Sequence, residues 1–178
     1  ISSLSKLRYL ALDYNYLSIN TDALSRLTRL RSLKLQYNYE IISGIEPLQS
    51  LQLLRALDMS STSGTGLQVD NVHVFESLVE LRLDNAYVSG IFSKVLPHTL
   101  QVISVRGNRI EGTLPSLGPD LREADFGDNF MTGTIARQSA ALRLRMLRVD
   151  CNFFMSMQLQ ASDHPRLRSL DASMNSDL

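Results

Sequence analysis

The sequence has one cysteine, no excess of positive or negative charge and no long apolar run. A single cysteine, Cys151, among 178 residues excludes a small domain that depends on several intramolecular disulfide bonds. The 18 basic and 18 acidic residues balance, and this argues against a nucleic-acid-binding domain, which usually carries a positive excess. No apolar run approaches the roughly 18 residues that cross a bilayer, so we expect no membrane insertion by this segment.

Two further absences concern the compartment and the chain ends. None of the nine asparagines stands in an N-x-Ser/Thr glycosylation acceptor. Together with the single cysteine, this favours a reducing, intracellular compartment, with a surface or extracellular location as the alternative. The start of the chain lacks an initiator methionine, a basic region and an apolar signal core, so we expect a fragment of a longer chain.

What the sequence does contain is one leucine-patterned unit, repeated in register. The string L-x-x-L-x-L-x-x-N reads directly at 7–15 and returns with intervals of 21 to 24 residues. The eight copies begin at Leu7, Leu30, Leu54, Leu78, Leu100, Leu121, Leu144 and Leu167. Six copies keep the final asparagine, whereas Thr62 and Ala86 replace it in copies three and four.

Within each unit, alternation of apolar and polar residues predicts a short strand with one inward face. One such strand cannot bury its apolar side alone, so the copies are expected to stack into a parallel sheet. The strands are predicted near 9–13, 32–36, 56–60, 80–84, 102–106, 123–127, 146–150 and 169–173. The asparagine falls where each strand turns away, and its amide can satisfy buried turn groups. At Ala86 we expect a local break or a water.

The pattern and its period resemble the leucine-rich-repeat superfamily over nearly the whole chain. The resemblance implies one domain, residues 1–178, with an α/β-type horseshoe solenoid. Its concave side would be a parallel sheet of about eight strands, and its convex side short helical, 3-10 or extended segments. Partners of this superfamily usually bind to the concave face.

The connecting segments differ along the chain. Segments 21–27 and 45–51 read as short helical turns with an N-cap or an early proline. Segment 60–66 is rich in Ser and Gly and reads as an irregular loop. Segments 88–91, 110–115 and 131–135 resemble the L-x-G-x-I/L-P signature of the plant-specific repeat class, also found in protist surface antigens, and predict a second short strand after the glycine. This resemblance implies a receptor ectodomain or surface protein.

The outward strand positions give the candidate partner-binding surface. It is polar, mixed in charge and richer in carboxylates than in bases. We expect partner contacts from Tyr9, Asp13, Lys34, Tyr37, Glu80, Arg82, Asp84, Arg106, Glu123, Asp125, Arg148, Asp150 and Asp171. The charges either recognise a charged partner or pair with one another across neighbouring strands. The tyrosines either anchor a partner or cover a flank.

No enzyme is expected. The histidines His73, His98 and His164 fall in different connecting segments without metal-ligand spacing, and Cys151 has no evident partner base. We therefore predict no catalytic residue, metal or cofactor. The leading hypothesis is a protein–protein interaction module or scaffold. The alternatives are a ligand-binding ectodomain of a receptor or surface antigen, and a structural subunit of a large assembly. The partner and the oligomeric state stay open.

Overall fold

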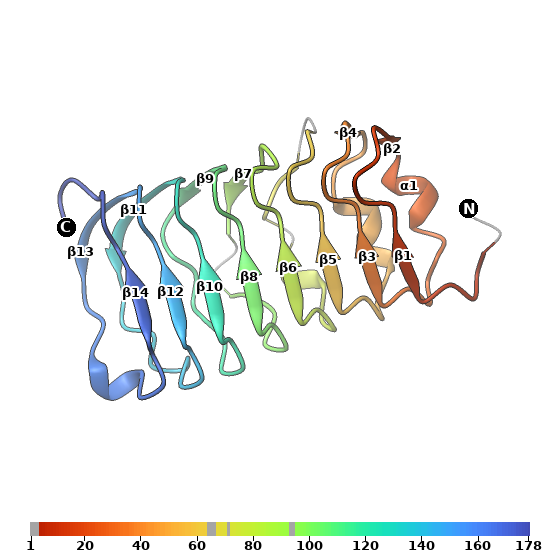
Figure 1. The fold of residues 1–178 in the computed structure, drawn as a ribbon. Coiled ribbons are helices and arrows are strands. Elements are labelled where there is room, and N and C mark those ends of the chain that lie inside the picture. Colours follow the sequence, from red (N-terminus) through yellow and green to blue (C-terminus); the bar gives the residue numbers. More distant parts are fainter. Residues whose placement is uncertain (1–3, 64–66, 71, 93–94) are drawn as a thin grey trace.

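In the computed structural model, eight short parallel strands form one sheet that runs along a solenoid (Figure 1). The structure describes residues 4–63, 67–70, 72–92 and 95–178. The strands, one from each repeat, are β1 (Tyr9–Ala11), β3 (Ser32–Lys34), β5 (Ala56–Asp58), β6 (Glu80–Arg82), β8 (Val102–Ser104), β10 (Glu123–Asp125), β12 (Met146–Arg148) and β14 (Ser169–Asp171). They hydrogen-bond in this order. The predicted leucine-rich-repeat solenoid is therefore confirmed, and each repeat is one rung of it.

Every strand begins at its predicted residue but ends two residues earlier than predicted. The cause is a left-handed backbone turn that follows each strand. In all eight rungs the residue before the asparagine position has a positive φ, between 51° and 69°; these residues are Tyr14, Tyr37, Ser61, Asn85, Gly107, Asp128, Cys151 and Met174. Hydrogen bonding between rungs nevertheless continues through this turn, since the Tyr14 N–H donates to the carbonyl of Gln36 at 3.0 Å.

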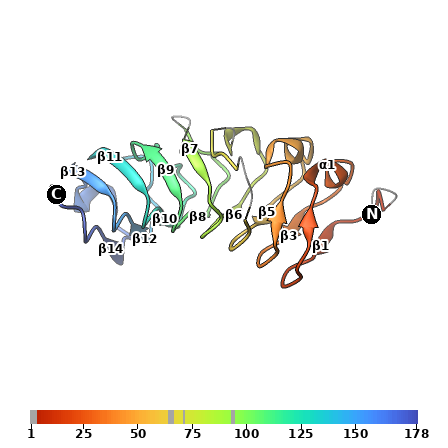
Figure 2. The ribbon, with the colours of Figure 1, turned by 90° about the horizontal axis from the view of Figure 1, so that it is seen from above.

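The opposite side of the solenoid changes character along the chain, as predicted (Figure 2). The first connection contains helix α1 (Thr21–Leu24), capped by Asn20, and the second contains the 3-10 turn η1 (Glu46–Ser50). The other connecting elements are β2 (Ser18–Ile19), β4 (Glu40–Ile41), η2 (Val72–Val74) and η3 (Ala161–Asp163). The strands β2 and β4 pair with each other. The loop predicted at 60–66 lies partly outside the described residues.

Later repeats build a second parallel sheet. It is four-stranded, with β7 (Ser89–Ile91), β9 (Arg109–Gly112), β11 (Phe130–Ile135) and β13 (Phe153–Met157). A second strand in each of these three repeats is confirmed, but it begins earlier than predicted. Gly90 and Gly133 lie inside their strands, and Gly112 ends β9, so the prediction of a strand after that glycine is wrong; φ is 81° at Gly112 and 84° at Gly133. The seventh repeat also contributes a strand, β13, although it lacks the glycine signature. Its phenylalanines and methionines extend readily along β11.

The inward leucines form one continuous core between the two sides. Leu33, Leu57, Leu81 and Leu147 in the strand centres are at most 1% exposed. At the first rung, Leu10 and Leu12 are only partly buried and pack against this core. Among the described residues, no helix is long and apolar enough to cross a membrane.

The asparagines form a buried ladder along the turn that follows the strands. Asn129 Nδ2 donates to the carbonyl of Val105 in the preceding rung (2.9 Å) and to that of Phe126 in its own (3.1 Å). Its Oδ1 accepts the N–H of Ile110 at 3.0 Å. Asn38, Asn108, Asn152 and Asn175 make the same kinds of contact. The ladder thus satisfies buried backbone groups of two rungs at once.

The ladder is interrupted at the third and fourth rungs, where the sequence predicts a break. The Thr62 hydroxyl donates to the carbonyl of Met59 in its own rung at 2.7 Å, and this replaces one of the amide contacts. Ala86 is fully buried, and its N–H is accepted by Asn108 Oδ1 at 3.1 Å. The backbone of the fourth rung thus stays bonded to the ladder through Asn108 of the next rung.

Replacing Asn129 with alanine tests the ladder. We expect the free energy of unfolding to fall by about 2–4 kcal/mol, because buried backbone groups in two rungs lose their partners. The matched control is Asn15→Ala, since Asn15 is exposed and bonds only to carbonyls of its own rung, and it should cost about 0.5 kcal/mol. Urea denaturation followed by circular dichroism measures both. Equal losses would contradict a role that depends on burial between rungs.

Candidate binding surface

The parallel register places the outward side chains in columns across the eight-stranded sheet. Tyr9 lies beside Ser32, and Arg82 lies between Asp58 and Ser104, as the repeat alignment predicts. The first column runs from Tyr9 through Glu80 and Glu123, and the second contains Lys34, Arg82, Asp125, Arg148 and Asp171. Tyr9, Lys34, Glu123 and Arg148 are exposed. Tyr37 lies beyond its strand, at the turn.

Most of the predicted charged residues pair with one another. We define the central charge cluster as Asp84, Ser104, Arg106, Asp125, Arg148 and Asp150. Arg106 binds Asp150 through two hydrogen bonds, of 2.9 and 2.6 Å. Asp125 lies 3.5 Å from both Arg106 and Arg148. The interpretation that charges pair across neighbouring strands is therefore confirmed for this cluster.

A missing side chain makes the Arg106–Asp150 pair possible. The two residues belong to the fifth and seventh rungs, and Gly127 occupies the equivalent position between them. A Cβ at Gly127 would lie 2.2 Å from Arg106 Nη1 and 2.7 Å from Asp150 Oδ1. This glycine is therefore required for space, because it leaves the path over which the guanidinium reaches across one rung.

Within the central charge cluster, the pKa values of Asp150 and Asp84 are shifted in opposite directions. Its hydrogen bonds to Arg106 hold the pKa of the Asp150 carboxyl below its ordinary value. The pKa of Asp84 is raised because burial disfavours its charged form, although the Ser104 hydroxyl (2.6 Å) and the Arg106 N–H (2.9 Å) donate to it. Three aspartates face two arginines in the cluster, so one carboxylate charge is in excess.

The remaining predicted residues are arranged around the cluster or apart from it. Glu80 and Arg82 form a pair within one strand at 2.6 Å, and Asp171 binds the Ser173 hydroxyl at 2.7 Å. Asp13 is half-buried at the first rung. A hollow of about 300 Å³ lies above β6 to β12, and its lining includes Arg82, Glu123, Met146 and Arg148. The sheet thus brings together residues of four rungs that are far apart in the sequence.

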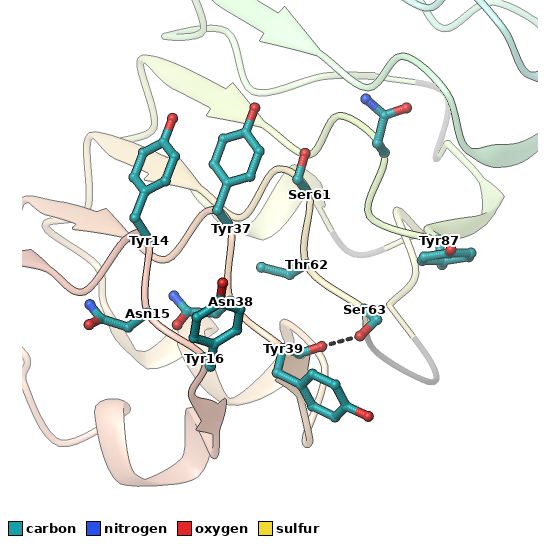
Figure 3. A pocket seen from close by; sticks show the side chains of 11 residues that line it. Tyr14, Asn15, Tyr16, Tyr37, Asn38, Tyr39, Ser61, Thr62, Ser63 and Tyr87 are labelled. Atoms are coloured by element: carbon teal, nitrogen blue, oxygen red, sulfur yellow. Dashed lines mark hydrogen bonds between the residues drawn. The ribbon is translucent and has the colours of Figure 1, made fainter.

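A second hollow lies at the turns that follow the first four strands (Figure 3). It is an open pocket of about 570 Å³, and its lining includes five tyrosines: Tyr14, Tyr16, Tyr37, Tyr39 and Tyr87. Sequence analysis named only Tyr37 of these as a site residue. The signal was present, because all five stand one position before or after the asparagine position of their repeats.

The possible metal ligands and nucleophiles, within the part of the chain that the structure describes, are the histidines, the cysteine and the carboxylates. Among the described residues, no group of three His, Cys, Asp or Glu side chains could hold a metal ion. Burial, together with the Asp150 carboxylate, raises the pKa of the Cys151 thiol above its ordinary value. Its Sγ lies 3.5 Å from Met174 Sδ in the next rung. This environment disfavours the thiolate form that a nucleophilic cysteine needs.

Comparison with known proteins supports the fold. No protein-family model matches the chain, and no curated protein sequence matches it significantly. Among solved structures, the leucine-rich-repeat ectodomain of the plant membrane receptor kinase GASSHO1/SCHENGEN3 from Arabidopsis thaliana, in complex with CASPARIAN STRIP INTEGRITY FACTOR 2, is 24% identical with a TM-score of 0.79. The match covers 93% of this chain and 21% of that one.

Two further structures share the fold. TLR13 in complex with ssRNA13 is 19% identical with a TM-score of 0.62, and the match covers 98% of this chain and 26% of that one. The plant peptide hormone receptor RGFR1 in complex with RGF2 is 20% identical with a TM-score of 0.65, with 98% and 41% covered. The chain therefore spans between about a fifth and two fifths of the length of these proteins.

The lowered pKa of Asp150 predicts how the free energy of unfolding depends on pH. Because its folded pKa is depressed, its stabilising effect is present above its unfolded pKa of about 3.9 and is lost as the pH falls through the folded value. Asp150→Asn should lower the free energy of unfolding by about 1–3 kcal/mol at pH 7, and this difference should shrink only below about pH 3.9. Urea denaturation at a series of pH values measures it.

The matched control is Asp120→Asn, which breaks the Arg143–Asp120 pair of 2.6 Å between two exposed side chains. It should cost less than about 1 kcal/mol. The interpretation fails if both variants cost the same, or if the Asp150→Asn penalty already shrinks between pH 5 and 6.

The role of Gly127 is tested by Gly127→Ala. The added methyl group displaces the Arg106 guanidinium and should lower the free energy of unfolding by about 1–3 kcal/mol, through the same pair that Asp150→Asn breaks. The double variant should therefore lose clearly less than the sum of the two single losses. Full additivity in urea denaturation would show that the two residues act independently.

Proposed function

We propose that this segment is a protein-binding module whose eight-stranded face contacts a protein partner. The observation that carries the proposal is the unbroken register of eight rungs, which sets polar and charged side chains of distant repeats on one surface. Such a surface gives a partner many aligned contacts from a rigid support. The proposed contact residues are those predicted from the sequence. Among them, Tyr9, Lys34, Glu123 and Arg148 are exposed, and of these Arg148 also pairs with Asp125.

The charge of the surface suggests what the partner brings to it. Asp84, Asp125 and Asp150 are already engaged by arginines and hydrogen bonds, so they hold the surface in shape more than they offer free charge. Glu123 is exposed beside this carboxylate-rich centre. We therefore infer that a basic group of the partner contacts Glu123. TLR13 is bound to ssRNA13, but the carboxylate excess here disfavours a nucleic acid.

A receptor ectodomain is the second candidate, and the four-stranded second sheet favours it. The sequence signature that predicts this sheet resembles the plant-specific repeat class. GASSHO1/SCHENGEN3 and RGFR1, which share the fold, are receptors in complex with CASPARIAN STRIP INTEGRITY FACTOR 2 and with RGF2. A scaffold and a receptor would use the same face, so the two differ in what is joined to this segment. A permanent place in a large assembly is the third candidate.

One pair of matched variants tests the proposed face. The partner is first isolated by cross-linking to the chain in its source cells and identified by mass spectrometry. Its affinity is then measured by calorimetry for the natural chain, for Glu123→Lys and for Glu111→Lys. Both changes reverse an exposed glutamate, but Glu111 lies on β9 of the opposite sheet.

Glu123→Lys should weaken binding by about five- to thirty-fold, because it places like charges together at the contact. Glu111→Lys should leave the affinity within about twofold. Equal effects of the two variants would place the partner elsewhere. A complex that resists dissociation during purification and forms only with one fixed set of subunits would favour the assembly subunit.

A further inference from the structure

The tyrosine-lined pocket has the form of a notch one rung wide. The third repeat carries the small residues Ser61, Thr62 and Ser63 at the turn, where the first and second repeats carry tyrosines. Tyr37 and Tyr39 of the second rung border this gap on one side, and Asn85 and Tyr87 of the fourth rung border it on the other. We call these seven residues the tyrosine notch. Figure 3 shows the small residues between the tyrosines of both sides.

Two of the three tyrosine rings of the notch, those of Tyr37 and Tyr87, contact other side chains. The ring of Tyr37 stacks on that of Tyr14, with 4.5 Å between centroids and 15° between planes. The guanidinium of Arg109 lies 5.6 Å from the centroid of the Tyr87 ring. The Ser63 hydroxyl donates to the carbonyl of Tyr39 and ties the floor to one wall. A preorganised aromatic site loses little side-chain entropy when a ligand binds.

The lining of the pocket is aromatic and polar. None of the eleven described residues that line it is charged, and the charge beside it is the guanidinium of Arg109 against the Tyr87 ring. The five tyrosines are between 51% and 98% exposed. Within the part of the chain that the structure describes, none of their hydroxyls hydrogen-bonds to another residue. The site therefore offers flat apolar rings and free donors, and it calls for an uncharged ligand with unpaired acceptors.

A polyproline II segment supplies this combination. Its backbone carbonyls have no internal partners and its proline rings are apolar, so it binds well to aromatic grooves. Its three-residue turn rises about 9.3 Å, and the walls of the notch stand two rungs apart, about 9.6 Å at the usual strand spacing. Binding of the ligand as an added β-strand is disfavoured, because the backbone of the turn already bonds to both neighbouring rungs. The Tyr37 N–H donates to the carbonyl of Ser60 in the third rung, and the Tyr14 N–H of the first rung donates to the carbonyl of Gln36 in the second.

We propose that the tyrosine notch binds an uncharged, proline-rich segment of a protein partner in the polyproline II conformation. The proposal rests on the protein-binding function inferred above, but it assigns a different surface. Tyr39 and Tyr87 flank a turn of the ligand, and the hydroxyls of the notch donate to its carbonyls. Ser61 and Ser63, which stand where the first two rungs carry tyrosines, are then what makes room for the ligand.

The test uses a twelve-residue polyproline peptide and an alternating Gly-Ser peptide of equal length. The chain has no tryptophan, and five of its six tyrosines line the pocket, so tyrosine fluorescence reports directly on the notch. Polyproline should change this fluorescence saturably and bind at least about tenfold more tightly than the Gly-Ser peptide. Calorimetry measures the affinities.

Three variants separate the notch from the rest of the surface. Tyr39→Ala should weaken polyproline binding by about five- to thirty-fold, as expected for loss of an aromatic anchor. Ser61→Tyr should abolish it by filling the gap, and it should fold, because Tyr14 and Tyr37 occupy the same left-handed position in their rungs. Tyr9→Ala, on an equally exposed tyrosine of β1, should leave the affinity within about twofold.

The proposed contact at Glu123 and the proposed proline site in the tyrosine notch can be tested independently of each other. Glu123→Lys should leave polyproline binding unchanged, and Ser61→Tyr should leave contacts at Glu123 unchanged. Equal affinity for the two peptides, or polyproline binding that survives Ser61→Tyr, would overturn the notch as a proline site. Binding of the oligosaccharide cellohexaose in place of polyproline, lost in Tyr39→Ala, would overturn it too and assign the tyrosines to a sugar ligand.

Discussion

The structure depends on how each rung satisfies the backbone of the turn where its strand ends. A parallel sheet of three-residue strands leaves many N–H and carbonyl groups at that edge, and stacking buries them. The asparagine ladder bonds these groups within and between rungs, and the left-handed residue before each asparagine turns the chain toward the other side. Short strands, a common register and an ordered edge all follow from this arrangement.

The same constraint explains where side chains become available for binding. The positions on either side of the ladder residue must lie at the edge of the sheet, because the ladder residue itself points inward. In the first and second rungs both positions carry tyrosines, and in the fourth rung they carry Asn85 and Tyr87, whereas the third rung carries two serines. A gap in the ladder and a gap in the row of tyrosines thus coincide. The edge becomes a recessed aromatic site beside the flatter charged face.

On the face of the sheet, ion pairs hold the central side chains in place. Three aspartates and two arginines come close together, because each arginine bonds to carboxylates of neighbouring or next-neighbouring rungs. Gly127 shows how much this depends on one absent side chain. The cluster keeps charged groups fixed at the centre of the proposed binding face, and Glu123 is exposed beside it.

The repeat, the order and register of the eight strands, the early helical turns and the later second sheet could be predicted from the amino-acid sequence. These features follow from local periodicity, which fixes the side of a strand on which each residue lies. The connection of outward residues two rungs apart, such as that of Arg106 over Gly127 to Asp150, became visible in the folded structure alone. The same holds for the tyrosines around the ladder, which surround a common notch. Such relations depend on side-chain reach and on the space left by a neighbouring rung, and no single repeat contains that information.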